Sequence, residues 1–231
     1  MSFADFQRKL ICWLCQSVNL DPARLEGLEP EPVSFRDDFK DQDAFLRRWS
    51  WPPDSWHVLA PEGLRLAHST FPILTKTLGL LRDCEFRFRT RIEREAVGWV
   101  IKGTVPPGHL IPAFCVMFNL SDSGRLRVHI LNEQRIASNS LYQIIKTQSV
   151  EIEKSTDGWL NLITKTRGDI IEVSNEGRVI FGGDFSKEPY VSCYGFPDKQ
   201  GQVGFRCCGS EEATVNFVEV TELSTVDLAV T

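Results

Sequence analysis

From about residue 34 onward, apolar and polar side chains alternate at every second position along much of the chain. This is the period of a β-strand that buries one face and exposes the other. The clearest segment is CEFRFRTRIERE, which begins at Cys84 and places Phe86 and Phe88 on one face and its Arg and Glu side chains on the other. The pattern predicts a half-buried strand here.

Turn sequences separate the predicted strands. The segments AFCVMFNL and GRLRVHIL meet at Ser121-Asp122-Ser123-Gly124, which indicates a hairpin. Residues 157–183 contain three further short strands, divided at Gly168 and Gly177, where tight turns favour glycine. Many short strands with no helix between them are typical of an antiparallel sandwich or barrel, so we predict an all-β fold.

The first 33 residues follow a different pattern. Between residues 2 and 18 the apolar side chains recur every three to four positions, and Ser2 can cap the helix that this period predicts. Pro30 and Pro32 form a stiff connector. We predict a short N-terminal α-helical extension over residues 1–33, a β-sandwich over residues 34–222 and a tail over residues 223–231. The short helix must rest its apolar stripe on the sandwich or on a protein partner.

Charge and composition exclude several classes of function. The net charge is -5, which gives no support for a nucleic-acid partner. No apolar run approaches the about 20 residues of a spanning helix, and the first residues lack the continuous apolar stretch of a signal peptide. The seven cysteines, an odd number, fit buried reduced thiols. We therefore expect a cytoplasmic protein that binds no membrane.

Three stretches together carry a resemblance to a known superfamily. They are FRDDFKDQDAFLRRWSWPPDSWHVLAPEGLRL from Phe35, DGWLNLITKTRGDIIEVSNEGRVI from Asp157 and GQVGFRCCGSEEATVNFVEV from Gly201. In this order they resemble the concanavalin A-like lectin/glucanase superfamily, in particular its laminin-G-like and 3-keto-disaccharide-hydrolase-like branch. The resemblance implies an antiparallel jelly-roll sandwich over residues 34–222.

The resemblance also implies how the ends of the sandwich meet. Residues 213–220 would pair beside the first strand, around residues 35–39, after Gly201 and Gly204 turn the chain into the penultimate strand. It further implies a concave sheet that can hold a ligand.

The glucan-cleaving members of this superfamily are similar to one another in a Glu-x-Asp-x-Glu strand, whose alternation places carboxylates on one face. This chain lacks that motif: Glu151-Ile152-Glu153 has the right step but no third acid in register. We therefore do not expect glucanase-type hydrolysis and favour a protein that is not an enzyme. Hydrolysis of modified disaccharides, of the 3-keto-glycoside type, stays open because it has no compact signature to search for.

Candidate ligand-binding residues place planar polar or aromatic side chains at alternate strand positions. Sugars stack on aromatic rings and accept paired hydrogen bonds, because a pyranose has an apolar face and a polar edge. Alternatively, Trp99 belongs to the core and the arginine row is a solvated face paired with glutamates. Three arginines on one face repel unless acids or a ligand compensate their charge. On the concave face we predict Arg87, Arg89, Arg91, Trp99, Arg127, His129 and Asn161.

The segment RRWSWPPDSWHV supplies three more aromatic candidates at the rim of the sandwich: Trp49, Trp51 and Trp56. They are either loop plugs or a platform for a ligand. Asp37 and Asp38 could contribute to a calcium site, but two aspartates do not fill its six to eight oxygen positions, so we assign no metal and no cofactor.

These observations predict non-catalytic recognition of a carbohydrate or glycan-like ligand on the concave sheet. A hydrolase that acts on modified disaccharides is one alternative. An intracellular protein-interaction module, which would use the N-terminal helix to bind a partner, is the other.

Overall fold

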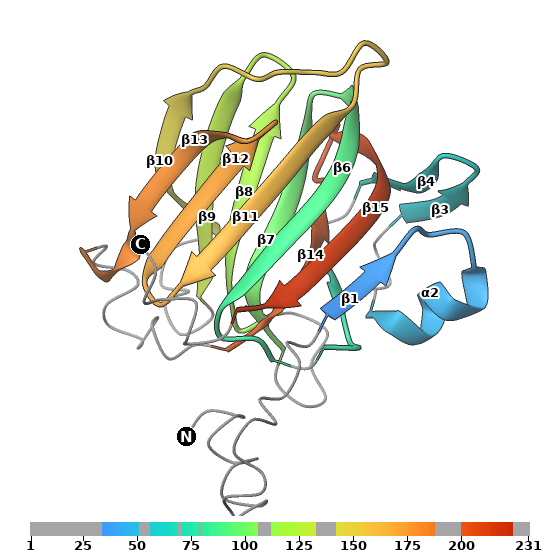
Figure 1. The fold of residues 1–231 in the computed structure, drawn as a ribbon, viewed down its shortest axis with the longest axis horizontal. Helices are drawn as coiled ribbons and strands as arrows, with labels where there is room; N and C mark the ends of the chain where they lie inside the picture. The colour runs from blue at the N-terminus through green and yellow to red at the C-terminus, as the bar shows by residue number, and fades with distance from the viewer. Residues whose placement is uncertain are drawn as a thin grey trace, which may run out of the picture. The chain divides into compact units, whose positions relative to one another are not determined.

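Two antiparallel β-sheets form nearly all of the described structure (Figure 1). This computed structural model describes residues 34–50, 56–68, 71–78, 80–105, 112–132, 142–187 and 200–223. All of them belong to one compact unit, Val33–Thr231. The predicted helical extension over residues 1–33 lies outside the described residues and stays a prediction.

Within the described residues, the first sheet has eight strands in the order β13-β12-β11-β6-β15-β4-β3, with β1 also paired to β15. The tilted strands β11, β6 and β15 form its centre (Figure 1). Its strands are β1 (Ser34–Asp37), β3 (Trp56–Ala60), β4 (Gly63–Ala67), β6 (Cys84–Arg94), β11 (Leu160–Arg167), β12 (Ile170–Asn175), β13 (Arg178–Asp184) and β15 (Glu212–Glu222).

The second sheet has seven strands in the described part of the chain, in the order β10-β9-β8-β7-β14-β5-β2. Helix α2 (Gln42–Arg48) precedes β2, and the short 3-10 helix η3 (Phe185–Lys187) follows β13. The strands are β2 (Trp49–Ser50), β5 (Ile73–Thr75), β7 (Ala96–Thr104), β8 (Phe114–Ser121), β9 (Arg125–Asn132), β10 (Tyr142–Ser149) and β14 (Gln202–Arg206).

The first and last strands lie side by side, as the sequence predicts. β1 and β15 are antiparallel, with Phe35 opposite Val220. The prediction that Gly201 and Gly204 form a turn is wrong, because Gly204 lies inside β14. A Cβ atom at Gly204 would overlap the carbonyl oxygen of Ile73 on β5, so the residue is glycine because two strands approach closely.

The core fills the space between the two sheets. Phe86 and Phe88 of β6 face inward and meet Trp99 of β7 and Phe205 of β14. Trp99 is 0% exposed, and its Nε1 donates a 2.9 Å hydrogen bond to Oγ1 of Thr164 on the opposite sheet. The prediction that Trp99 is a ligand platform is therefore wrong. Its side chain is a core residue with its single polar atom satisfied.

The rim prediction is also wrong for Trp49, which is 1% exposed. Asp41 caps α2 by accepting a hydrogen bond from the Ala44 backbone, and the short helix delivers Trp49 into the core beside Phe39 and Phe45. The prediction placed Trp49 in an open loop because it did not foresee α2. Trp51 lies outside the described residues, and Trp56 lies on β3 with a side chain that is also outside them.

None of the helices in the described residues combines the length and the apolar character that a bilayer-spanning segment needs.

Candidate functional site

The structure divides the predicted ligand-binding residues between two opposite surfaces. Arg87, Arg89 and Arg91 on β6 and Asn161 on β11 lie on the outer face of the eight-stranded sheet, because their alternate neighbours Phe88 and Leu162 belong to the core. Arg127 and His129 lie on the outer face of the seven-stranded sheet, because Leu126 and Val128 face the core there. We call the first surface the Arg89 face and the second the Asn119 face.

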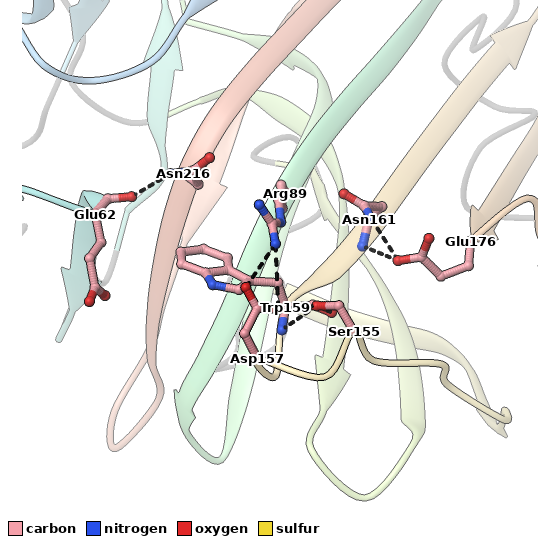
Figure 2. Close-up of polar contacts among 8 residues, drawn as sticks. All are labelled: Glu62, Arg89, Ser155, Asp157, Trp159, Asn161, Glu176 and Asn216. Carbon is pink, nitrogen blue, oxygen red and sulfur yellow. Dashed lines mark hydrogen bonds and ion pairs between the residues drawn. The ribbon is translucent and has the colours of Figure 1, made fainter.

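On the Arg89 face, the guanidinium of Arg89 contacts an acid and an aromatic ring (Figure 2). Its Nη2 donates to Oδ2 of Asp157 at 3.1 Å, and its Cζ lies 5.2 Å from the ring centroid of Trp159. Its Nε is buried and has no hydrogen-bond partner in the described part of the chain. Asn161 stands directly opposite Arg89 in the β11–β6 ladder and donates through Nδ2 to Glu176 at 2.7 Å.

A tight turn presents Asp157 to Arg89. Ser155 Oγ donates to the Asp157 carboxylate and accepts from the backbone N–H of Trp159 at 3.1 Å (Figure 2). The hydrogen bond from Ser155 is the main cause of the lowered pKa of Asp157, and Arg89 adds to it. Asp157 is therefore held as a carboxylate beside the guanidinium.

The other two arginines of the row are also paired with acids. Arg91 Nη2 donates to Glu62 at 2.6 Å, and Arg91 Nε donates to Glu93 at 3.0 Å. Arg87 Nη2 donates to Glu85 at 2.9 Å. Acids thus compensate the repulsion along the row, and the alternative of a solvated, ion-paired strand face describes this surface better.

Glu93 and Asp157, two acids beside the arginine row in the described part of the chain, do not have the raised pKa of a glycosidase acid. Partial burial works to raise the pKa of Glu93, but hydrogen bonds from Thr214 and Arg91 outweigh it and lower the pKa. The pKa of Asp157 is lowered as well, whereas the acid of a glycosidase needs a raised pKa. Trp159 is only 6% exposed and is covered by the guanidinium groups of Arg89 and Arg91, so it offers no open ring to a ligand.

On the Asn119 face, four strands place polar side chains in one row. Arg206 of β14 stands opposite Gly98 of β7, Gly98 opposite Asn119 of β8, and Asn119 opposite Arg127 of β9. His129 is two residues further along β9, on the same face. A Cβ atom at Gly98 would overlap the Arg206 carbonyl oxygen, so only glycine fits at this position of the row.

Glu211, in the turn between β14 and β15, holds Asn119 in place. Its Oε1 accepts from Asn119 Nδ2 at 2.8 Å, and its Oε2 accepts from the backbone N–H of Cys208 at 2.7 Å. The amide orientation leaves Asn119 Oδ1 as an acceptor. Burial raises the pKa of Glu211, while the hydrogen bonds from Cys208 and Asn119 limit the shift. Arg206 is buried, at 7% exposed, and its Nη1 lies 3.2 Å from Met117 Sδ.

The pKa of His129 reflects the burial and the positive charges on this face. Burial lowers the pKa of His129 to about 4, and the charges of Arg206 and Arg127 lower it further. The imidazole is therefore neutral at pH 7, and its buried Nε2 has no hydrogen-bond partner within the described residues. Arg127, unlike the arginines of the Arg89 face, has no carboxylate partner there either.

Sequence reasoning selected Arg127 and His129 but missed Asn119, Arg206 and Glu211. A local signal exists for two of them: Asn119 is the one polar side chain in AFCVMFNL, and Arg206 interrupts the apolar run around Phe205. A polar residue within a buried strand needs a partner or a role. Glu211 gives no such signal, since it lies in a polar turn.

The described residues offer no evident metal centre or thiol nucleophile. No group of three or more His, Cys, Asp and Glu side chains among them could hold a metal ion. Asp37, considered above for calcium, instead accepts from Phe39 N at 2.9 Å and Trp49 Nε1 at 3.0 Å. Burial raises the pKa of Cys84 to about 11 and those of Cys115 and Cys207 to about 12, which keeps these thiols protonated.

No protein-family model and no curated protein matches the sequence. Solved structures do match the fold. A protein of unknown function with a galectin-like fold from Bacillus subtilis has a TM-score of 0.61 at 10% identity, over 84% of this chain and 97% of that one. The laminarinase catalytic domain from Thermotoga maritima MSB8 has a TM-score of 0.55 at 8% identity, over 84% and 100%.

The carbohydrate-binding module CBM66 from Bacillus subtilis is a third counterpart, with a TM-score of 0.51 at 14% identity, over 73% of this chain and 91% of that one. At these identities the likeness establishes the fold alone. The chain has an all-β antiparallel jelly-roll sandwich fold like those of these proteins, which is the fold that the resemblance in the sequence implied. Membership in the concanavalin A-like lectin/glucanase superfamily stays a prediction. The narrower laminin-G-like and 3-keto-disaccharide-hydrolase-like assignment stays a prediction.

Proposed function

We propose that this protein is a non-catalytic carbohydrate-recognition domain and that the ligand binds on the Asn119 face. The observation that carries the proposal is the row Arg206, Gly98, Asn119 and Arg127 across four adjacent strands, with His129 beside it. This transfers the predicted binding role from the Arg89 face, whose arginines are paired with acids.

The chemistry of the row suits a polyhydroxylated ligand. Neighbouring sugar hydroxyls each donate and accept, so planar side chains with fixed donors and acceptors can bind them in pairs. Asn119 offers an acceptor and Arg127 offers donors, while the neutral ring of His129 lies beside them with its Nε2 buried. The fold's counterparts, which include a carbohydrate-binding module and a laminarinase catalytic domain, give independent support for a carbohydrate ligand.

A binding role fits the Asn119 face better than hydrolysis does. Cleavage of a glycosidic bond calls for a proton donor and a second carboxylate on the other side of the bond. Glu211 has the raised pKa of a proton donor, but both of its carboxylate oxygens already accept hydrogen bonds from the protein. We therefore assign Glu211 the role of positioning Asn119.

The binding proposal is tested with a glycan array and titration calorimetry on the full chain. Asn119→Ala and Arg127→Met should each weaken binding by about 10-fold or more, the equivalent of one lost polar contact. Arg89→Met, on the opposite sheet, is the matched control and should bind like the wild type. Absence of binding to every glycan, or equal losses in Arg89→Met and Arg127→Met, would overturn the proposal.

Hydrolysis of a modified disaccharide remains a second candidate, favoured by the raised pKa of Glu211. The test is product formation from glycans and from 3-keto-glycosides, followed by chromatography. Turnover that disappears in Glu211→Gln would make the protein an enzyme. Tight binding of a glycan that is recovered intact supports recognition without catalysis.

A further inference from the structure

We infer that the carbohydrate bound on the Asn119 face is acidic, with its carboxylate or sulfate group recognised by Arg127, and that the charge of Arg206 adds to the positive potential of this face. This inference rests on the proposed function and adds the class of ligand. It starts from a difference between the two outer faces, which display the same residue type in two environments.

Each arginine of the β6 row has a carboxylate within hydrogen-bond distance. Arg87 pairs with Glu85, Arg89 with Asp157 and Arg91 with both Glu62 and Glu93. These pairs neutralise the Arg89 face. An anionic ligand would have to displace an acid that is already in place.

Arg127 is in the opposite situation. It is half-buried on β9 and has no carboxylate partner among the described residues. Its neighbour across the ladder is the neutral Asn119, whose amide is held by Glu211. A guanidinium that is partly removed from water and lacks a counter-ion is a favourable site for an anion.

Arg206 adds a second positive charge at the other end of the row. Three strand spacings separate Arg206 from Arg127, or about 14 Å between their backbones. Arg206 is buried and acts through its charge, whereas the half-buried guanidinium of Arg127 can bind a planar carboxylate with two hydrogen bonds. Asn119 lies between the two arginines in this row, where its side chain can face the hydroxyl groups of the ligand.

The charges of both arginines affect the pKa of His129. After burial, the charges of Arg206 and Arg127 are the next causes of its lowered pKa. The two guanidinium groups therefore produce a positive potential at His129. Such a potential attracts anions and weakens with added salt.

The experiment compares matched ligands that differ only in charge. Oligogalacturonates and their methyl esters form one pair, and glycans with and without sulfate form another on the same array. We expect the acidic member of at least one pair to bind 10-fold or more tightly at low salt, and this advantage to shrink as salt is added. The identity of that pair separates carboxylate from sulfate recognition.

Variants then locate the charge. Arg127→Met should abolish the preference for the acidic member, Arg127→Lys should keep part of it, and Arg89→Met should leave it unchanged. Unfolding midpoints verify that each variant is folded. NMR titration of His129 is a readout that does not depend on affinity, because a bound anion beside the ring should raise its pKa from about 4.

The outcomes separate the two proposals. Equal or tighter binding of the neutral members overturns the acidic preference and leaves carbohydrate recognition standing. A preference that survives Arg127→Met unchanged also overturns it. Absence of binding to neutral and acidic glycans alike removes the proposed function, and the inference with it.

Discussion

Trp99 and Thr164 join the two sheets through the core: the indole N–H of Trp99 on β7 donates to the hydroxyl of Thr164 on β11 at 2.9 Å. Both residues are 0% exposed. Replacing Thr164 by valine keeps the shape but leaves the indole donor without a partner, which should lower the free energy of unfolding by about 1–3 kcal/mol. Urea unfolding measures the loss. Thr164→Ser, which keeps the hydroxyl, should lose less than Thr164→Val, and the reverse order would contradict this account.

The Trp99 contact shows why its role could not be read from the sequence. The segment AVGWVI is apolar at nearly every position, so it carries no alternation that would assign Trp99 to a face. All of β7 up to Gly103 is buried. The position of Trp49 could not be read from the sequence either. It depends on α2, a helix of seven residues that directs the chain toward the core just before Trp49.

The alternation in β6 predicted its two faces correctly, yet it could not say which other residues share them. β6 and β7 are consecutive in the chain but belong to different sheets. Glu95, with a φ of 59°, is the single residue between them. Arg89 and Arg127 therefore end on opposite surfaces. Which sheet a strand joins depends on pairings between residues far apart in the chain, as when β7 brings Arg206 beside Gly98.

Asp37 should contribute far more to stability than Asp157. Both aspartates accept a side-chain hydrogen bond, Asp37 from Trp49 and Asp157 from Arg89. Asp37 is 4% exposed and accepts from Phe39 N and Trp49 Nε1. Asp37→Asn turns an amide donor toward one of those donors, and we expect the free energy of unfolding to fall by about 1–3 kcal/mol. Asp157→Asn on the exposed turn is the control and should produce no resolvable change in the urea midpoint. Equal losses in both variants would refute the assignment.

His129 should make the protein less stable in mild acid. Its pKa is about 4 in the folded protein and near 6.5 in an unfolded chain, so the unfolded state binds a proton first as the pH falls. Stability should therefore decline from pH 6.5 down to about pH 4, by about 1–2 kcal/mol after allowance for partial exposure. His129→Gln should remove this part of the decline. Urea unfolding at pH 7 and pH 4.5 tests it, and an identical decline in both proteins would contradict the prediction.

Glu211 should control ligand affinity through Asn119 without touching the ligand. Glu211→Asp keeps the charge but shortens the side chain by one methylene, so its carboxylate can no longer reach both Asn119 Nδ2 and Cys208 N. We expect the amide of Asn119 to lose its fixed orientation and the affinity for a bound glycan to fall by about 5- to 10-fold. The decisive measurement is a double-mutant cycle with Asn119→Ala. If Glu211 acts by positioning Asn119, Glu211→Asp should cost little further affinity once Asn119 is alanine. Fully additive losses would mean that Glu211 contributes by another route, such as general stability of the β14–β15 turn.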